Sequence, residues 1–101
     1  MNKLTKEFSA MLKELEELYY RTEDEEEKEK LIAHHKNLSE KLEKVTRAQF
    51  DRNDKYYQEA IEKLKKTKKE ITKHLKTQLQ IVELFKYLTD FTEQLDALLF
   101  N

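Results

Sequence analysis

The sequence contains no cysteine, no glycine and no proline, and each absence excludes a class of structure. Without cysteine the chain has neither disulfide staples nor thiolate metal sites, and its composition suits a reducing compartment. Glycine and proline build the tight turns of hairpins and most loops, so their complete absence argues against a β fold. Leucine, lysine, glutamate and glutamine, which all favour helices, dominate instead. We therefore predict an all-α protein.

The sequence also has no long uninterrupted apolar run. Its first 18 residues mix charged and apolar side chains and lack the apolar centre of a signal peptide. No segment approaches the roughly 18 uncharged apolar residues that a membrane span needs. We expect no secretion signal, no membrane span and a cytoplasmic location.

Charged residues make up 41% of the 101 residues and hydrophobic ones 38%, with a net charge of −1. This length fits a single helical domain covering residues 1–101. Such a high charge content favours disorder only when the net charge is also large and apolar residues are scattered. Here the apolar residues recur at helical spacing, which indicates helices with narrow apolar seams and wide solvated faces.

The apolar spacing predicts three helices, at roughly residues 3–21, 24–50 and 54–99. The first carries a broad apolar stripe. The second carries only a sparse heptad row, Leu31, Leu38 and Val45, which is typical of a coiled-coil seam. Two patterns mark the start of this second helix. Thr22 followed by Glu25 fits a capping box, and Asp24 is the other candidate cap.

A chain reversal is predicted near residues 51–54. The heptad row of the second helix fails beyond Val45, and Asp51-Arg52-Asn53-Asp54 is the densest group of residues that favour caps and turns. A reversal there brings the two apolar ends of the chain together and lays the acidic run 23–29 beside the lysine run 63–76. We therefore predict an antiparallel coiled-coil-like helical hairpin or a three-helix bundle, with a self-associated four-helix arrangement also open.

No pattern in the sequence predicts catalysis. His34 and His35 are adjacent and point about 100° apart on a helix, so they do not chelate one ion together. We expect His35 to be a polar seam residue, in position to face His74 or Glu70 across the hairpin. Glycine-rich phosphate loops and nucleophile motifs are missing. We expect a non-enzyme with no catalytic residue, no cofactor, no metal site and no small-molecule substrate.

The widest apolar surface lies in the last quarter of the chain, and it predicts contact with a helical partner or a second copy. The predicted function is a non-enzymatic protein–protein interaction module, as an adaptor, assembly component or small chaperone that forms homo-oligomers. The predicted partner-binding residues are Phe8, Leu12, Leu15, Tyr19, Leu84, Phe85, Leu88, Phe91, Leu95, Leu98, Leu99 and Phe100.

The alternative function is association with nucleic acid through the lysine run. Its residues are Lys63, Lys65, Lys66, Lys68, Lys69, Lys73 and Lys76. Phosphate binding needs surplus positive charge on one face. We rank this alternative second because the run contains no arginine, and because the acidic run of the same chain is expected to neutralise it.

Overall fold

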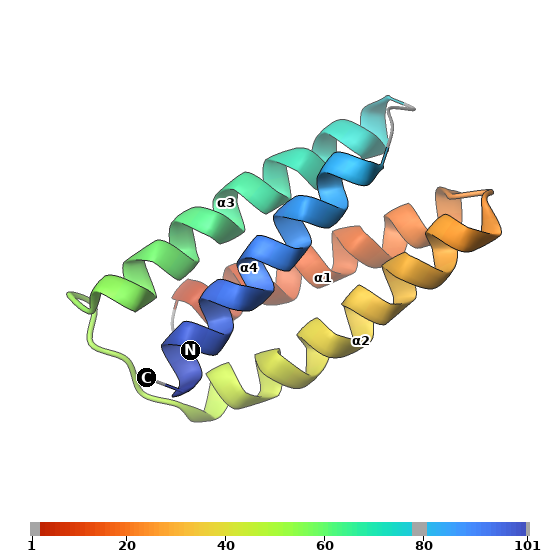
Figure 1. Cartoon of the computed structure of the whole chain (residues 1–101). Helices are drawn as coiled ribbons and strands as arrows, with labels where there is room; N and C mark the ends of the chain where they lie inside the picture. Colours follow the sequence, from red (N-terminus) through yellow and green to blue (C-terminus); the bar gives the residue numbers. More distant parts are fainter. Residues whose placement is uncertain (1–2, 78–80, 101) are drawn as a thin grey trace.

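A computed structural model describes residues 3–77 and 81–100, and all regular structure in these ranges is α-helical. It comprises four helices: α1 (Lys3–Arg21), α2 (Glu25–Arg47), α3 (Lys55–Lys76) and α4 (Val82–Phe100). They pack lengthwise into a bundle with extents of 40 × 21 × 20 Å (Figure 1). The all-α prediction is confirmed, and the predicted count of three helices is wrong.

The third predicted helix, 54–99, is two helices. α3 ends at a C-cap, Thr77, whose extended backbone donates its N–H to the Lys73 carbonyl at 3.0 Å. Residues 78–80, which the prediction included in this helix, lie outside the described residues. A straight helix of this length would reach about 70 Å, at least twice the length of α1 (19 residues) or α2 (23 residues). Folding its second half back lets the apolar face of α4 pack along the whole bundle.

The first two helices follow the prediction closely. Asp24 is the N-cap of α2, with its Oδ1 accepting a hydrogen bond from the Glu26 N–H at 2.9 Å. Thr22 does not form a capping box, because its hydroxyl donates to the Leu18 carbonyl at 2.8 Å and closes the last turn of α1. An aspartate, Asp54, likewise forms the N-cap of α3.

The predicted reversal near residues 51–54 is confirmed. α2 ends at Arg47, and Asp51 Oδ1 accepts from the Asn53 N–H at 2.8 Å within the turn. Asp54 then caps α3 by accepting from the N–H groups of Tyr56 and Tyr57, at 2.8 and 3.2 Å. The carboxylates of Asp51 and Asp54 accept from backbone donors that the turn and the helix start leave open, so no glycine is needed.

The bundle consists of two antiparallel hairpins, α1–α2 and α3–α4, that lie side by side (Figure 1). α1 neighbours α3, where Glu14 meets the Thr72 hydroxyl at 3.5 Å, and α2 neighbours α4, where Lys41 pairs with Asp96. The two members of each of these pairs run in the same direction. α1 and α4 lie on one diagonal of the bundle and α2 and α3 on the other, so the connection 48–54 crosses the bundle. This arrangement is neither of the two predicted folds.

The apolar ends of the chain meet in the core, as predicted. Phe8 of α1 and Phe91 of α4 are fully buried, and their rings make an edge-to-face contact at 5.1 Å. All four helices contribute to one apolar cluster, whose fully buried larger members are Phe8, Phe91, Leu4, Met11, Leu15, Leu31, Leu38, Leu64, Ile71, Leu84, Leu88 and Leu95. Each helix therefore depends on side chains from distant parts of the sequence.

α2 is the most thinly anchored helix. Its buried residues are Leu31, Leu38 and Val45, which is the predicted heptad row. Its interface with α4 is the loosest of the four between neighbouring helices. Within the described ranges, no helix combines the length and apolarity that a bilayer crossing requires.

Candidate functional site

Most of the predicted partner-binding residues belong to the core of the bundle. Eight of the twelve are buried: Phe8, Leu12, Leu15, Leu84, Leu88, Phe91, Leu95 and Leu98. Tyr19, Phe85 and Leu99 are partly buried against them, and Phe100 remains 70% exposed. The wide apolar face of α4 is buried within the chain because α4 folds back and packs against α2 and α3. A partner surface must therefore be sought elsewhere on the bundle.

A groove opens between α2 and α4, where these helices pack most loosely. It encloses about 570 Å³ and is lined by Lys30, His34, Val82, Phe85, Lys86, Thr89 and Asp90. Val82, at the start of α4, is 58% exposed and lies beside the partly buried Phe85 in this lining. Phe85 is the member of the predicted partner-binding set that lines this groove.

The lining of the groove combines aromatic and cationic side chains. The His34 ring stacks on Phe85 at 5.6 Å with 17° between the planes, and Lys30 Nζ lies over the same ring at 5.8 Å. Lys30 also lies 3.7 Å from Glu26 on its own helix. Lys86 adds a second positive charge, and Asp90 is the acidic group among the lining residues.

The other half of the α2–α4 interface is closed by charged side chains. Lys41 and Asp96 form an ion pair in which the lysine is mostly buried. Lys44 Nζ lies over the exposed Phe100 ring at 5.4 Å. These two contacts hold the helices together near the C-terminal ends of both, so the groove lies toward their N-terminal ends.

Burial lowers the pKa of His34 below its ordinary value of 6.5. The imidazole in the folded chain is therefore harder to protonate than in the unfolded chain, where water solvates the cation. Because unfolded His34 binds a proton more readily than folded His34, protonation favours the unfolded chain. The contribution of His34 to the free energy of unfolding is therefore highest above pH 6.5 and decreases as the pH falls below 6.5.

We therefore expect acidification from pH 7.5 to 5.5 to lower the free energy of unfolding. His34→Gln, which cannot be protonated, should lose less stability over the same range. Urea titrations followed by circular dichroism at both pH values measure the difference. His35 and His74 are common to the two proteins and serve as the internal control. An equal loss in both proteins would contradict the expectation.

A smaller apolar hollow lies between α1 and α2. It encloses about 150 Å³, and its lining residues include Tyr19, Tyr20, Ile32 and His35. Tyr20 is 73% exposed and Ile32 is 52% exposed. His35 therefore lies at the α1–α2 edge. It does not face His74 or Glu70 across a hairpin as predicted, because α2 and α3 lie on a diagonal of the bundle.

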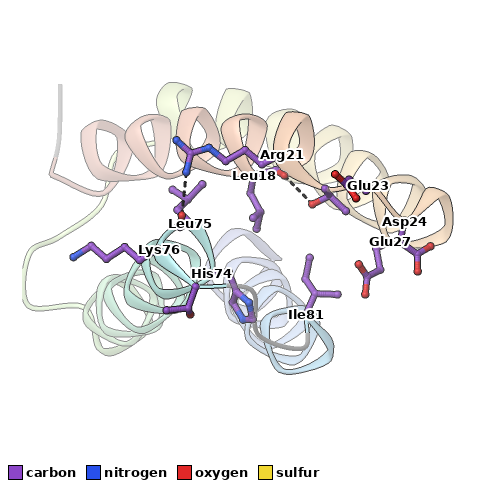
Figure 2. A pocket seen from close by; sticks show the side chains of 11 residues that line it. Leu18, Arg21, Glu23, Asp24, Glu27, His74, Leu75, Lys76 and Ile81 are labelled. Carbon is purple, nitrogen blue, oxygen red and sulfur yellow. Dashed lines mark hydrogen bonds between the residues drawn. The ribbon is translucent and has the colours of Figure 1, made fainter.

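A hollow of about 600 Å³ lies at one end of the bundle between the α1–α2 turn and the last turn of α3 (Figure 2). Arg21 crosses it, donating from Nη1 to the Leu75 carbonyl at 3.0 Å and from Nη2 to Glu17 at 2.8 Å. Asp24 is engaged as the cap of α2. Arg21 and Asp24 form hydrogen bonds with backbone groups at helix ends, and Arg21 links α1 to α3. Both residues therefore have structural roles.

His74 forms part of the wall of this end hollow and is only 8% exposed. Its Nε2 lies 3.5 Å from Glu70 Oε1 one turn earlier on α3, which is too long for a strong hydrogen bond. Among the described residues, no three histidine or carboxylate groups come together in a way that could hold a metal ion. His74 therefore acts as a buried packing residue beside Glu70.

The lysine run lies on α3 and is largely exposed. Lys65, Lys66, Lys69, Lys73 and Lys76 are exposed, whereas Lys63 and Lys68 are intermediate. The acidic run 23–29 reaches only the last turn of α3, at the end hollow, because α2 and α3 lie on a diagonal. The predicted alignment of the two runs is therefore wrong along most of their length.

Comparison with known proteins identifies no relative: no family model, curated protein or solved structure matches this chain. The class that the fold defines is a four-helix bundle of paired hairpins. Its function has to be argued from its surfaces.

Proposed function

We propose that this protein is a non-enzymatic protein–protein interaction module, an adaptor or assembly component, that binds an amphipathic helix of a partner in the α2–α4 groove. The observation that carries the proposal is the apolar floor formed by Val82 and Phe85 at the loosest interface of the bundle. An exposed aliphatic side chain beside a partly buried ring gains from being covered by a partner.

The shape and charge of the groove specify the partner. A channel between two helices accepts a third helix, whose apolar residues at i, i+3, i+4 and i+7 point into it. Lys30 and Lys86 outnumber Asp90 along the rims, so glutamates or aspartates beside the apolar residues of the partner fit best. Such rim charges raise the association rate and exclude partners with basic flanks.

The environment of His34 supports a binding role over a catalytic one. A catalytic histidine needs a partner that orients it and a substrate proton within reach. The His34 ring instead stacks on Phe85, and burial lowers its pKa. A neutral ring packed on another ring contributes apolar contact area to the floor of a groove.

The test is an NMR titration of the labelled protein with a designed helical peptide of about 15 residues, which carries leucines at helix-face spacing and glutamates on both flanks. Amide shifts are expected to concentrate at Lys30, His34 and residues 82–90. A matched peptide with lysines in place of the glutamates should bind at least tenfold more weakly, because it places positive charge against Lys30 and Lys86.

Val82→Asp supplies the variant control. Val82 is exposed, so the fold is expected to persist. The new carboxylate repels the acidic peptide and makes this part of the groove polar and hydrated. Binding should fall at least tenfold. The proposal fails if the glutamate peptide produces no shifts at millimolar concentration, or if shifts appear away from the groove. It also fails if sedimentation shows that a second copy of the chain already occupies the groove.

A further inference from the structure

α3 carries a surplus of positive charge, whereas the rest of the chain is negatively charged overall. α3 carries eight lysines and three glutamates, a surplus of five positive charges, while the whole chain has a net charge of −1. All other residues together therefore carry a net charge of −6. This separation produces a strong charge asymmetry across a bundle only about 20 Å thick.

The exposed lysines form a continuous ridge. The core side of α3 is occupied by Leu64, Thr67, Ile71 and His74. Lys65, Lys66, Lys69, Lys73 and Lys76 recur at spacings of three and four on the opposite side and are all exposed. We call these five residues the lysine ridge. At 1.5 Å per residue it extends over about 16 Å, and no acidic residue interrupts its exposed side.

Within residues 3–77 and 81–100, no ion pair includes any of the five lysines of the ridge. Of the neighbouring carboxylates, Glu70 lies 3.5 Å from His74 and Glu14 of α1 lies 3.5 Å from the Thr72 hydroxyl. Glu23, Asp24 and Glu27 line the end hollow together with Lys76, whose side chain points away from them (Figure 2). Glu62 shares the outer face but precedes the ridge by one turn. The ridge is therefore available to an external polyanion.

We propose that the lysine ridge binds the phosphate backbone of duplex DNA without sequence preference. Nucleic acids carry condensed counterions, and lysines that displace them gain the entropy of counterion release. The carboxylates of an ordinary acidic protein surface are less densely spaced than DNA phosphates and offer less such release, and an exposed lysine–carboxylate pair contributes little to affinity. A nucleic acid is therefore the polyanion that benefits most from a row of unpaired lysines.

The composition of the ridge selects duplex over single strand and excludes base recognition. Binding of single strands relies on aromatic side chains that stack on bases. The exposed tyrosine of α3, Tyr56, lies nine residues before the ridge begins. Reading of base edges relies mainly on arginine and amide side chains, and the ridge contains only lysine. A convex helix with lysines on its outer face fits the major groove of B-DNA, which is about 12 Å wide.

The experiment is fluorescence anisotropy of a labelled 20-base-pair duplex, titrated with the full chain at several salt concentrations. With four to five phosphates neutralised, the logarithm of the affinity should fall with the logarithm of the salt concentration with a slope of about −4. Duplexes of unrelated sequence should bind equally well. A single strand of the same length should bind more weakly.

Two triple variants with equal change in net charge locate the site. Lys66→Gln/Lys69→Gln/Lys73→Gln removes the centre of the ridge and should weaken binding at least tenfold, with the salt slope reduced by about 3 units. Lys6→Gln/Lys13→Gln/Lys36→Gln removes three exposed lysines of α1 and α2 and should change affinity less than twofold. All six positions are exposed, so circular dichroism should show both variants folded.

The inference is overturned by any of three results. One is an absence of binding to the duplex at 25 mM salt, with protein at about 100 μM, where even weak non-specific binding is detectable. Another is an equal loss of affinity in the two triple variants. The third is a polyglutamate chain that displaces the duplex at equal charge concentration, which would make the ridge a site for acidic proteins.

Discussion

Phe91→Ala is expected to lower the free energy of unfolding by about 3–5 kcal/mol, since it removes a fully buried ring and leaves a cavity in the middle of the bundle. The loss includes the edge-to-face contact with Phe8, 5.1 Å away on α1. A domain of this size has a total stability of about 5–15 kcal/mol. The variant should therefore unfold at much lower urea concentration than the parent protein.

Urea titration followed by circular dichroism at 222 nm measures this loss, and Val82→Ala is the matched control. Val82 lies on the same helix but is 58% exposed, so its truncation should cost less than about 1 kcal/mol. The result also separates two roles for Phe91. If Phe91→Ala kept full stability but changed the molar mass in solution, Phe91 would belong to an interface between molecules and its place in the core would be refuted.

Leu38→Ala is expected to cost about 2–5 kcal/mol, because Leu38 is the central member of the three buried residues that hold α2 on the bundle. α2 has few other apolar contacts with which to compensate, and its interface with α4 is loose. The remaining anchors, Leu31 and Val45, are each two helical turns away. Loss of the middle anchor should therefore affect α2 more than the other helices.

Hydrogen exchange followed by NMR tests this local effect. Amides of α2 in Leu38→Ala should exchange faster than those of α3, whereas Ile32→Ala should leave the pattern unchanged. Ile32 lies on the same helix and is 52% exposed, so it matches Leu38 in chemistry but not in burial. Uniform acceleration across all four helices would show that α2 is not an independently labile element.

The local features of the fold could be predicted from short stretches of sequence. The α2 seam of Leu31, Leu38 and Val45, the cap at Asp24 and the reversal near Asp54 all depend on neighbouring residues within a turn or two. The seam follows from helical periodicity, and the caps follow from hydrogen bonds to backbone N–H groups that a helix start leaves without a partner. The meeting of the two apolar chain ends was also predicted, but their contact through Phe8 and Phe91 depends on the folding back of α4, which was not predicted.

The break between α3 and α4 was not predicted, because no glycine or proline marks it. One signal was present: the heptad row Tyr57, Leu64 and Ile71 continues to Gln78, a polar residue where the seam requires an apolar one. A similar failure of the row beyond Val45 had correctly indicated the earlier reversal. The break matters for the candidate site, because it turns the apolar face of α4 into core and leaves Val82 and Phe85 at the groove.

The sequence by itself determined that this protein is helical, where its first reversal lies, and which face of each helix is apolar, because these properties depend on residues within a few turns of one another. Only the tertiary structure decided that α4 folds back, that α2 lies diagonally opposite α3, and that the acidic run reaches only the last turn of α3. An apolar stripe specifies that a face must be buried but not which helix buries it. That choice depends on how four helices together cover the most apolar surface, and it sets the surfaces that remain for partners.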